Sequence, residues 1–273
     1  MVAIVVPISN RPQLTADEEI SLRHLRHFLG SYDKFVIAPK GLKFQLPGFK
    51  TLRFSQKYFG SARAHGRLLF QADFYKTFDD YKYILIYHLD ALVFSDELMK
   101  WCETDVDYIG APWFSRSDPW NTEPIVGNGG LALMKIETVL NVLCERYRDA
   151  PVKYWEDRFE RFLRVLPKIL SYPKRLTPTW LRGSRSERLS KRLQTCEIHL
   201  RGNDSFWSYD AVKYVPGFKI PGWRTALRFS FECHPRKCFE LNGLKLPFGC
   251  HAWPRSDNWP RYEREFWEPY LLK

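Results

Sequence analysis

The hydrophobic positions near the start of the chain alternate between strand and helix patterns. Val2–Pro7 is a continuous apolar run, as in a strand that is covered on both faces. Residues 16–29 carry apolar side chains at helical spacing, and Gly30 follows them as a stop signal. Short apolar runs at Lys34–Ala38 and Thr51–Phe54 predict two further strands.

The next segments continue the alternation. Ser61 can cap a helix that follows it. Leu68, Ala72 and Tyr75 would share one face of that helix. Tyr81–Leu89 is strongly apolar and predicts another buried strand. Strands that alternate with helices predict an α/β fold, with a mostly parallel central sheet flanked by helices.

The rest of the chain is less regular. Asp107–Ala111 and Val126–Met134 predict two more strands, and the apolar stripe of residues 136–147 predicts a helix. From about 150 to 200 the composition becomes basic and interrupted by prolines, which predicts an insertion in a single domain. Within it, residues 174–192, called the basic region below, hold many Lys and Arg side chains against the single acid Glu187.

Composition and charge exclude several classes of protein. The 273 residues are 45% hydrophobic, enough for a sizeable core, which excludes disordered and fibrous chains. The net charge of +11 permits contact with anionic partners. Six cysteines without a CxxC pair predict free thiols rather than disulfides or a structural zinc site. Residues 1–7 are too short for a secretory signal and no apolar segment is long enough to span a membrane, so we expect a cytoplasmic protein.

One carboxylate stands at a position where ligands commonly bind. Asp90 directly follows the predicted strand Tyr81–Leu89, and ligands of open α/β sheets sit at the carboxyl ends of strands. A carboxylate buried there is costly unless it is paired or bound to a cation. Carboxylate oxygens suit Mg²⁺ and Mn²⁺. The alternative is that Asp90 caps the turn after the strand.

Three other segments carry residues that could take part in chemistry. The glycines of the Gly127–Gly130 segment allow a close approach to a ligand, or simply a tight turn before a strand. Asp204 could serve as a general base, or could be the N-cap of a helix. His251 could bind a metal or a phosphate, or could be an ordinary hydrogen-bonded histidine.

In order along the chain, five short segments resemble the GT-A-type glycosyltransferases. They are LDALVF (89–94), YIGAPWF (108–114), VGNGGLALMK (126–135), GNDSFW (202–207) and FGCHAW (248–253). The resemblance is closest to a bacterial and fungal family of unknown function to which glycosyltransferase activity is ascribed. It extends more distantly to β-1,3-galactosyl- and N-acetylglucosaminyltransferases. It implies one GT-A-like domain over 1–273, with a nucleotide-sugar half at about 1–135 and an acceptor half at about 136–273.

The resemblance implies a metal site and a donor site. Asp90 matches the last acid of the metal-binding DxD motif, and His88 stands at the first position, where the usual residue is Asp. His251 matches a late histidine that also binds the metal, Mn²⁺ or Mg²⁺. Gly129 and Gly130 match the segment under the donor sugar. Because His88 departs from the motif, it could instead contact the ribose or lie behind the metal ligands.

Further roles follow from the same resemblance. Asp204 matches the catalytic base of inverting members, although Asn203 stands where their preceding Glu would be. Contacts to the nucleotide are expected from Pro7, Arg11, Tyr58, Ser61 and Arg63. Three aromatic residues could stack on an acceptor sugar or could equally be packing residues, namely Trp113, Phe114 and Trp207.

Together these observations predict a metal-dependent, inverting glycosyltransferase. Its donor would be a UDP-hexose such as UDP-galactose, and its acceptor a glycan or lipid-linked glycan in polysaccharide biosynthesis. The basic region would contact the inner face of a membrane, or would be a solvated basic face. Two alternatives stay open, a retaining transferase of the same fold and a nucleic-acid-binding protein without catalysis. No RNA- or DNA-binding motif supports the last, and we expect no nucleic-acid partner.

Overall fold

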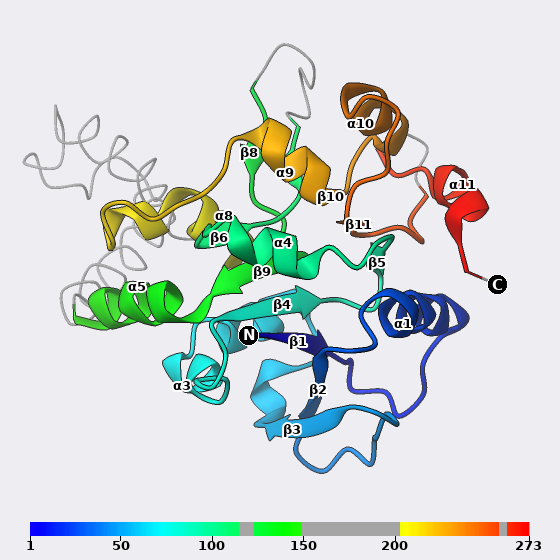
Figure 1. The fold of residues 1–273 in the computed structure, drawn as a ribbon. Coiled ribbons are helices and arrows are strands. Elements are labelled where there is room, and N and C mark those ends of the chain that lie inside the picture. Colours follow the sequence, from blue (N-terminus) through cyan, green and yellow to red (C-terminus); the bar gives the residue numbers. More distant parts are fainter. Residues whose placement is uncertain (115–122, 149–202, 257–260, 273) are drawn as a thin grey trace, which may run out of the picture.

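The structure is a computed structural model that describes residues 1–114, 123–148, 203–256 and 261–272. Its central sheet has the strand order β3-β2-β1-β4-β9-β6 (Figure 1). The strands are β1 (Val2–Pro7), β2 (Asp33–Pro39), β3 (Lys50–Phe54), β4 (Tyr83–Tyr87), β6 (Tyr108–Ile109) and β9 (Leu131–Lys135). The pairings among β3, β2, β1 and β4 are parallel, and β9 runs antiparallel to both of its neighbours. The predicted α/β class with a mostly parallel sheet is therefore confirmed.

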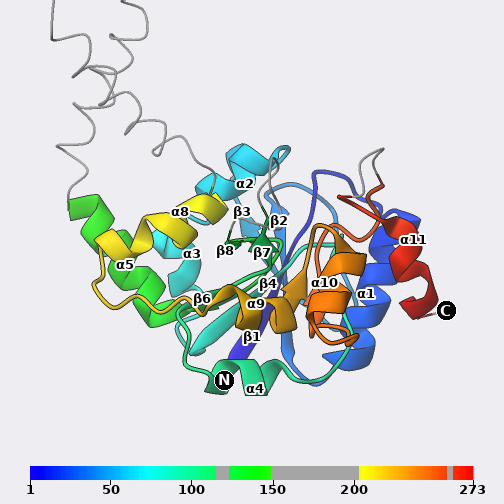
Figure 2. The same cartoon turned by 90° about the horizontal axis from the view of Figure 1, so that it is seen from above.

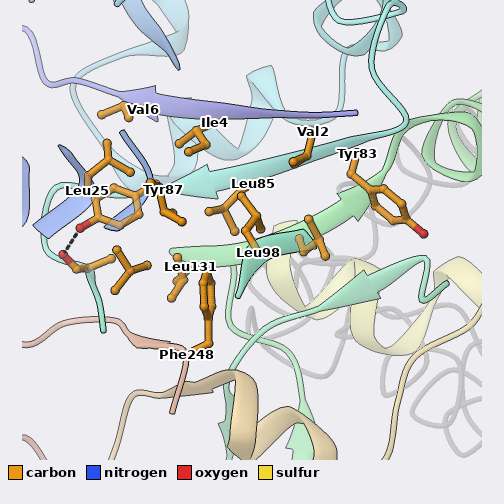
Figure 3. Close-up of a cluster of buried hydrophobic side chains, with 14 of the residues drawn as sticks. Val2, Ile4, Val6, Leu25, Tyr83, Leu85, Tyr87, Leu98, Leu131 and Phe248 are labelled. Atoms are coloured by element: carbon orange, nitrogen blue, oxygen red, sulfur yellow. Dashed lines mark hydrogen bonds between the residues drawn. The ribbon is translucent and has the colours of Figure 1, made fainter. Parts of the chain in front are cut away.

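The apolar run of β1 is buried on both faces of the sheet. Val2, Ile4 and Val6 belong to one core cluster, and Ala3 and Val5 belong to a second (Figure 3 shows the first). This alternation follows from the two-residue period of a strand. Burial of each large aliphatic side chain contributes roughly 1.5–3 kcal/mol, so the sheet centre anchors the fold.

Helices cover both faces of the sheet (Figure 2). The cluster that contains Ile4 also takes side chains from α1 (Ala16–Phe28), α4 (Leu98–Glu103) and α9 (Trp223–Phe229). The opposite cluster takes side chains from α2 (Ala62–Leu68), α3 (Ala72–Lys76), α5 (Ile136–Arg148) and α8 (Asn203–Tyr209). Helix α1 begins at a capping box, in which the Thr15 side chain accepts from the Glu18 amide and the Glu18 side chain accepts from the Thr15 amide.

Two small sheets, two short helices and three 3-10 turns complete the described part of the fold. One sheet has the order β10-β11-β5 and the other pairs β7 with β8. Their strands are β5 (Leu92–Val93), β7 (Pro112–Trp113), β8 (Ile125–Val126), β10 (Ser230–Phe231) and β11 (Gly249–Cys250). The other elements are α10 (Pro235–Leu241) and α11 (Arg264–Trp267), with 3-10 turns η1 (Gln56–Tyr58), η5 (Ala211–Lys213) and η6 (Glu268–Tyr270).

The predicted helix that begins after Ser61 is wrong in its length. Ser61 does cap α2, since its side chain accepts from the Ala64 amide, but α2 ends at Leu68 and the separate helix α3 begins at Ala72. The break leaves the Leu69 carbonyl without a helical partner, and the buried Tyr75 hydroxyl donates to it at 2.9 Å. A tertiary hydrogen bond thus replaces the helical bond that the periodicity suggested.

Other predictions meet the described residues only in part. The strand predicted at Val126–Met134 is split, because β8 ends at Val126 and β9 begins only at Leu131. The basic region lies outside the described residues. No helix in the described part of the chain is long and apolar enough to cross a membrane. The described cysteines are free thiols, as predicted, and Cys196 lies outside this part.

Candidate functional site

Strand pairing brings His251 next to Asp90. Strand β11 runs antiparallel to β5, with Cys250 opposite Leu92. His251 directly follows β11 and therefore meets the turn that precedes β5, and the Trp253 amide donates to the Asp90 carbonyl at 3.2 Å. Asp90 lies in that turn because β4 has ended at Tyr87. Asp90 therefore lies in a turn and also next to His251, so a place in the turn does not exclude a role as a ligand.

His88, Asp90 and His251 form a compact group of possible ligands for one metal ion, and these three residues are called the metal cluster below. Each offers one ligand atom, and these three atoms all lie within 4.8 Å of one another. The His251 Nε2 atom lies 3.1 Å from Asp90 Oδ1. The Arg255 guanidinium approaches the other Asp90 oxygen at 3.8 Å, and the Nε2 atoms of His65 and His88 lie 3.3 Å apart. The structure thus brings together Asp90 and His251, the two predicted metal ligands, and adds His88, which was predicted as a contact to the donor.

Opposing charges control the protonation of this cluster. Burial disfavours a charged His251, yet the carboxylates of Asp90 and Glu232 raise its pKa to about 10. Burial would raise the pKa of Asp90, but the charge of His251 outweighs it and holds that pKa well below its usual range. Burial and repulsion by the neighbouring histidines lower the pKa of His88 to about 3. Without a metal, His251 is therefore a cation and His88 a neutral ring.

The cluster has the chemistry of a divalent-cation site. Two imidazoles and one carboxylate suit a transition-metal dication such as Mn²⁺. A Cβ atom on Gly130 would lie only 2.0 Å from His251 Nε2, so a glycine keeps the space at this nitrogen free of a side chain. The proton on His251 places positive charge beside Asp90, where a bound dication would supply it instead. These residues therefore fit the metal that the resemblance implied.

A cavity of 730 Å³ opens beside the cluster. It is lined by the segment after β1, the start of α1, the turn before α2, and the end of β4. The predicted nucleotide contacts in its wall are Pro7, Arg11, Tyr58 and Ser61, together with His88 and Asp90. Arg63 is exposed on α2 and does not line the cavity. Four of the five predicted nucleotide contacts thus share one cavity with two residues of the metal cluster.

Acidic side chains at the mouth of the cavity are already paired. Glu18 receives a hydrogen bond from Arg11 at 2.7 Å. Asp17 receives two hydrogen bonds from Arg264, at 2.8 Å and 3.0 Å. These pairings offset the charge of both acids, which lowers the repulsion that an anionic ligand would meet at this end of the cavity.

The two glycines of the predicted donor segment lie against two different functional side chains. A Cβ atom on Gly129 would lie 2.2 Å from Asp204 Oδ1, and one on Gly130 would meet His251. The Gly130 carbonyl also accepts from the His88 amide at 2.8 Å. Asp204 is half-buried in the first turn of α8, one residue after the helix begins, and does not line the cavity. The segment therefore connects the predicted base with the metal cluster.

The three predicted aromatic contacts to an acceptor have different environments. Trp207 is fully buried and stacks on Phe218. The predicted contact of Trp207 with an acceptor is therefore wrong, and Trp207 is a packing residue of the core. Phe114 is half-buried and packs against the C-terminal core cluster. The Trp113 indole is half-buried and donates to Glu232 Oε2 at 3.0 Å.

Three residues of the site were not predicted from the sequence, namely His65, Glu232 and Arg255. Glu232 had a signal of the same kind as Asp90, namely an acid in an apolar segment, FSFECHP. His65 follows the predicted cap Ser61 by four residues, which places it one helical turn along α2. Nothing in the local sequence of Arg255 indicates that it approaches Asp90, because this contact is made only by the tertiary fold.

The chain is similar in fold to several solved glycosyltransferases. GlyE from Streptococcus pneumoniae TIGR4 is 13% identical with a TM-score of 0.44, over 99% of this chain and 60% of that one. Galactosyltransferase LgtC, solved with donor and acceptor sugar analogs, is 11% identical with a TM-score of 0.47, over 99% and 96%. Mannosyltransferase PcManGT from Pyrobaculum calidifontis, solved with GDP-Man and Mn²⁺, is 16% identical with a TM-score of 0.32, over 50% and 45%. The match to the bifunctional IspDF of Campylobacter jejuni covers 52% of this chain and only 42% of the length of IspDF.

Sequence comparison identifies the family. No curated protein sequence matches the chain significantly. The family model described as "Protein of unknown function (DUF5672)" matches residues 48–251, which is more than half of the chain and includes all three residues of the metal cluster. The match therefore shows that this chain belongs to the DUF5672 family of proteins of unknown function.

Proposed function

We propose that this chain is a metal-dependent glycosyltransferase that uses a nucleotide-sugar donor. The observation that supports this most strongly is the 730 Å³ cavity with His88 and Asp90 in its wall. Its size lies in the range of small-molecule and cofactor sites. A diphosphate in this cavity would lie beside the only predicted metal ligands that the described chain gathers into one cluster. A nucleoside diphosphate joined to a sugar has the matching combination of a base, a charged centre and a polar end.

The proposed donor is a UDP-hexose such as UDP-galactose. The segment after β1, which includes Pro7 and Arg11, would receive the base and ribose together with Tyr58 and Ser61. The sugar would then extend toward the glycine segment that ends at Gly130, because the diphosphate is held between these two parts of the site.

The proposed step is an inverting displacement. The oxygen of the acceptor hydroxyl forms a bond to the anomeric carbon, while the bond from that carbon to the diphosphate oxygen breaks. The Asp204 carboxylate takes the proton of the hydroxyl, which is the task of a general base. His88, Asp90 and His251 would hold the dication, which would supply positive charge next to the departing nucleoside diphosphate.

A thermal-shift comparison tests the donor class. The purified chain is heated with UDP, GDP, CDP or ADP, each with and without Mn²⁺. We expect UDP to raise the midpoint only with Mn²⁺, because a ligand at 100 times its dissociation constant stabilises the native state by about 2.7 kcal/mol. Stabilisation by another nucleotide would correct the donor, and no shift with any of them would contradict the proposed function.

Asp204→Asn tests the proposed base. We expect sugar transfer to fall by roughly 10²–10⁴-fold, with the UDP-dependent thermal shift unchanged. The same substitution at Asp73, whose side chain is 91% exposed on α3, is the matched control and should leave transfer unchanged. Normal turnover by Asp204→Asn would favour a retaining transferase. Salt-sensitive RNA or DNA binding without turnover of any nucleotide-sugar would favour the nucleic-acid alternative.

The proposed acceptor is a glycan or a lipid-linked glycan in polysaccharide biosynthesis. A lipid-linked acceptor would require peripheral contact with the inner face of a membrane, which we assign to the basic region 174–192. Each Lys or Arg near an anionic surface contributes about 1 kcal/mol. Co-sedimentation with vesicles that contain anionic lipid, but not with neutral vesicles, is the expected result.

A further inference from the structure

Glu232 is a buried carboxylate behind the metal cluster that the proposed chemical step does not use. It directly follows β10, and because β10 pairs with β11 it lies beside His251. It is 8% exposed. Its Oε1 atom lies 3.4 Å from His251 Nδ1, and its Oε2 atom accepts from the Trp113 indole at 3.0 Å. A carboxylate removed from water to this extent requires partners that compensate for its lost hydration.

The partners of Glu232 keep it ionised. Burial favours the neutral acid, but the close contact with His251 and its charge, followed by Asn128 and Trp113, lower its pKa. The Trp113 indole and the His251 ring face different oxygens of the carboxylate. The His251 Nδ1 atom is buried and makes no hydrogen bond of good geometry, so the 3.4 Å contact with Glu232 is the polar contact that the structure gives it.

The two nitrogens of His251 face different sides of the site. Nε2 points to Asp90 and to the space left by Gly130, while Nδ1 points to Glu232. A histidine binds a metal through a nitrogen that carries no proton, and a carboxylate on the other nitrogen fixes which one that is. We infer that Glu232 is a positioning residue, which holds the proton of His251 on Nδ1 and leaves Nε2 open for the dication. This inference rests on the metal site of the proposed function.

A second chain of contacts leads from Glu232 to His88. Asn128 is among the groups that lower the pKa of Glu232, and its Oδ1 atom accepts from the Gly130 amide at 2.8 Å. The Gly130 carbonyl in turn accepts from the His88 amide. Glu232 thus contacts one imidazole of the cluster directly, and Asn128 and the glycine segment link it to the other.

Metal affinity tests the inference without any substrate. Mn²⁺ binding is measured by electron paramagnetic resonance on the full chain, for the wild type and for Glu232→Gln. In Glu232 the two carboxylate oxygens face Trp113 and His251, but the glutamine amide has only one oxygen that can accept. Its NH₂ group cannot accept a hydrogen bond, so either Trp113 or His251 loses its acceptor. We expect the dissociation constant to rise about 10–100-fold, as for other partners of metal-binding histidines.

Trp113→Phe provides the matched control. It removes one donor to Glu232 but leaves the carboxylate and its contact with His251 in place, so the Mn²⁺ dissociation constant should rise far less than in Glu232→Gln. Thermal unfolding of both variants in EDTA measures their stability separately. If Glu232 only stabilised the fold, both variants would lose stability and Mn²⁺ affinity together.

The tautomer of His251 is measured directly on the wild-type chain, so the test does not depend on a variant that folds. With ¹⁵N-labelled histidine and Zn²⁺ as a diamagnetic probe, we expect His251 to carry its proton on Nδ1 and the metal on Nε2. The opposite assignment would overturn the inference, as would equal Mn²⁺ affinity of Glu232→Gln and the wild type.

The proposed function can fail separately. Weaker Mn²⁺ binding by Glu232→Gln, without any transfer of sugar by the wild type, would keep this inference and refute the transferase. If the wild-type chain bound neither Mn²⁺ nor Zn²⁺, both this inference and the proposed metal site would be refuted.

Discussion

The charge relation between Asp90 and His251 predicts how the metal-free chain responds to Asp90→Asn. The substitution keeps the size of the side chain and removes the carboxylate whose oxygen lies 3.1 Å from His251 Nε2. His251 is buried, so within the described residues its positive charge then keeps Glu232 as its close anionic partner. We expect the pKa of His251 to fall and the free energy of unfolding to decrease.

The magnitude follows from the raised pKa of His251. A pKa of about 10, against 6.5 for the free group, corresponds to roughly 5 kcal/mol of preference for the charged ring. Glu232 supplies part of that preference, and removing one partner of a buried pair costs about 3 kcal/mol, which is the loss that we expect near pH 6. Because the folded pKa is the higher one, the stabilisation is complete below about pH 6.5 and is lost as the pH rises through about 10.

Denaturant unfolding in EDTA, at intervals from pH 6 to pH 10, measures this difference. The gap between wild type and Asp90→Asn should be largest at pH 6 and should shrink toward pH 10. Asp96→Asn is the matched control, because Asp96 is exposed and accepts from the Tyr32 hydroxyl rather than from a histidine. Its effect should stay within about 0.5 kcal/mol. A gap that does not change with pH would refute the reasoning.

Two other substitutions test features of the same structure. Gly130→Ala should abolish Mn²⁺ binding, because its Cβ would lie 2.0 Å from His251 Nε2. Gly222 has open space around it, so Gly222→Ala should bind Mn²⁺ as the wild type does. Isothermal titration measures the Mn²⁺ affinity of both variants. Tyr75→Phe should lower the free energy of unfolding by about 1–3 kcal/mol, because it leaves the buried Leu69 carbonyl without its hydrogen-bond donor. Denaturant unfolding measures the loss. A loss below about 0.3 kcal/mol would mean that this hydrogen bond is not needed for the break between α2 and α3.

The parts of the fold that could be predicted are those set by local patterns. Val2–Pro7 was predicted with its observed bounds, because a continuous apolar run has few alternatives when its side chains are buried on both faces. The predicted helix at 16–29 corresponds to Ala16–Phe28, where the capping box adds a local start signal. The break between α2 and α3 could not be predicted, because it depends on Tyr75 reaching a carbonyl six residues away.

The site divides in the same way. Asp90 could be predicted from its position after an apolar strand, and His251 from the family resemblance. Glu232 and Arg255 could not be assigned to the site, since their contacts with His251 and Asp90 join segments far apart in the chain. Trp207 carried a pattern that fits either a ligand contact or the core, and only its burial decides between them.

Two antiparallel pairings explain why the site forms at one place. In a sheet of purely parallel strands, the segment before a strand lies at the edge opposite the ligand. Strand β9 runs antiparallel to β4, with Leu131 opposite Tyr87, so the glycine segment before β9 arrives where β4 ends. Strand β11 is antiparallel to β5, so the residue after it arrives at the turn before β5. Reversing either strand would move Gly130 or His251 away from Asp90, which makes the direction of these two strands as necessary to the site as the ligands themselves.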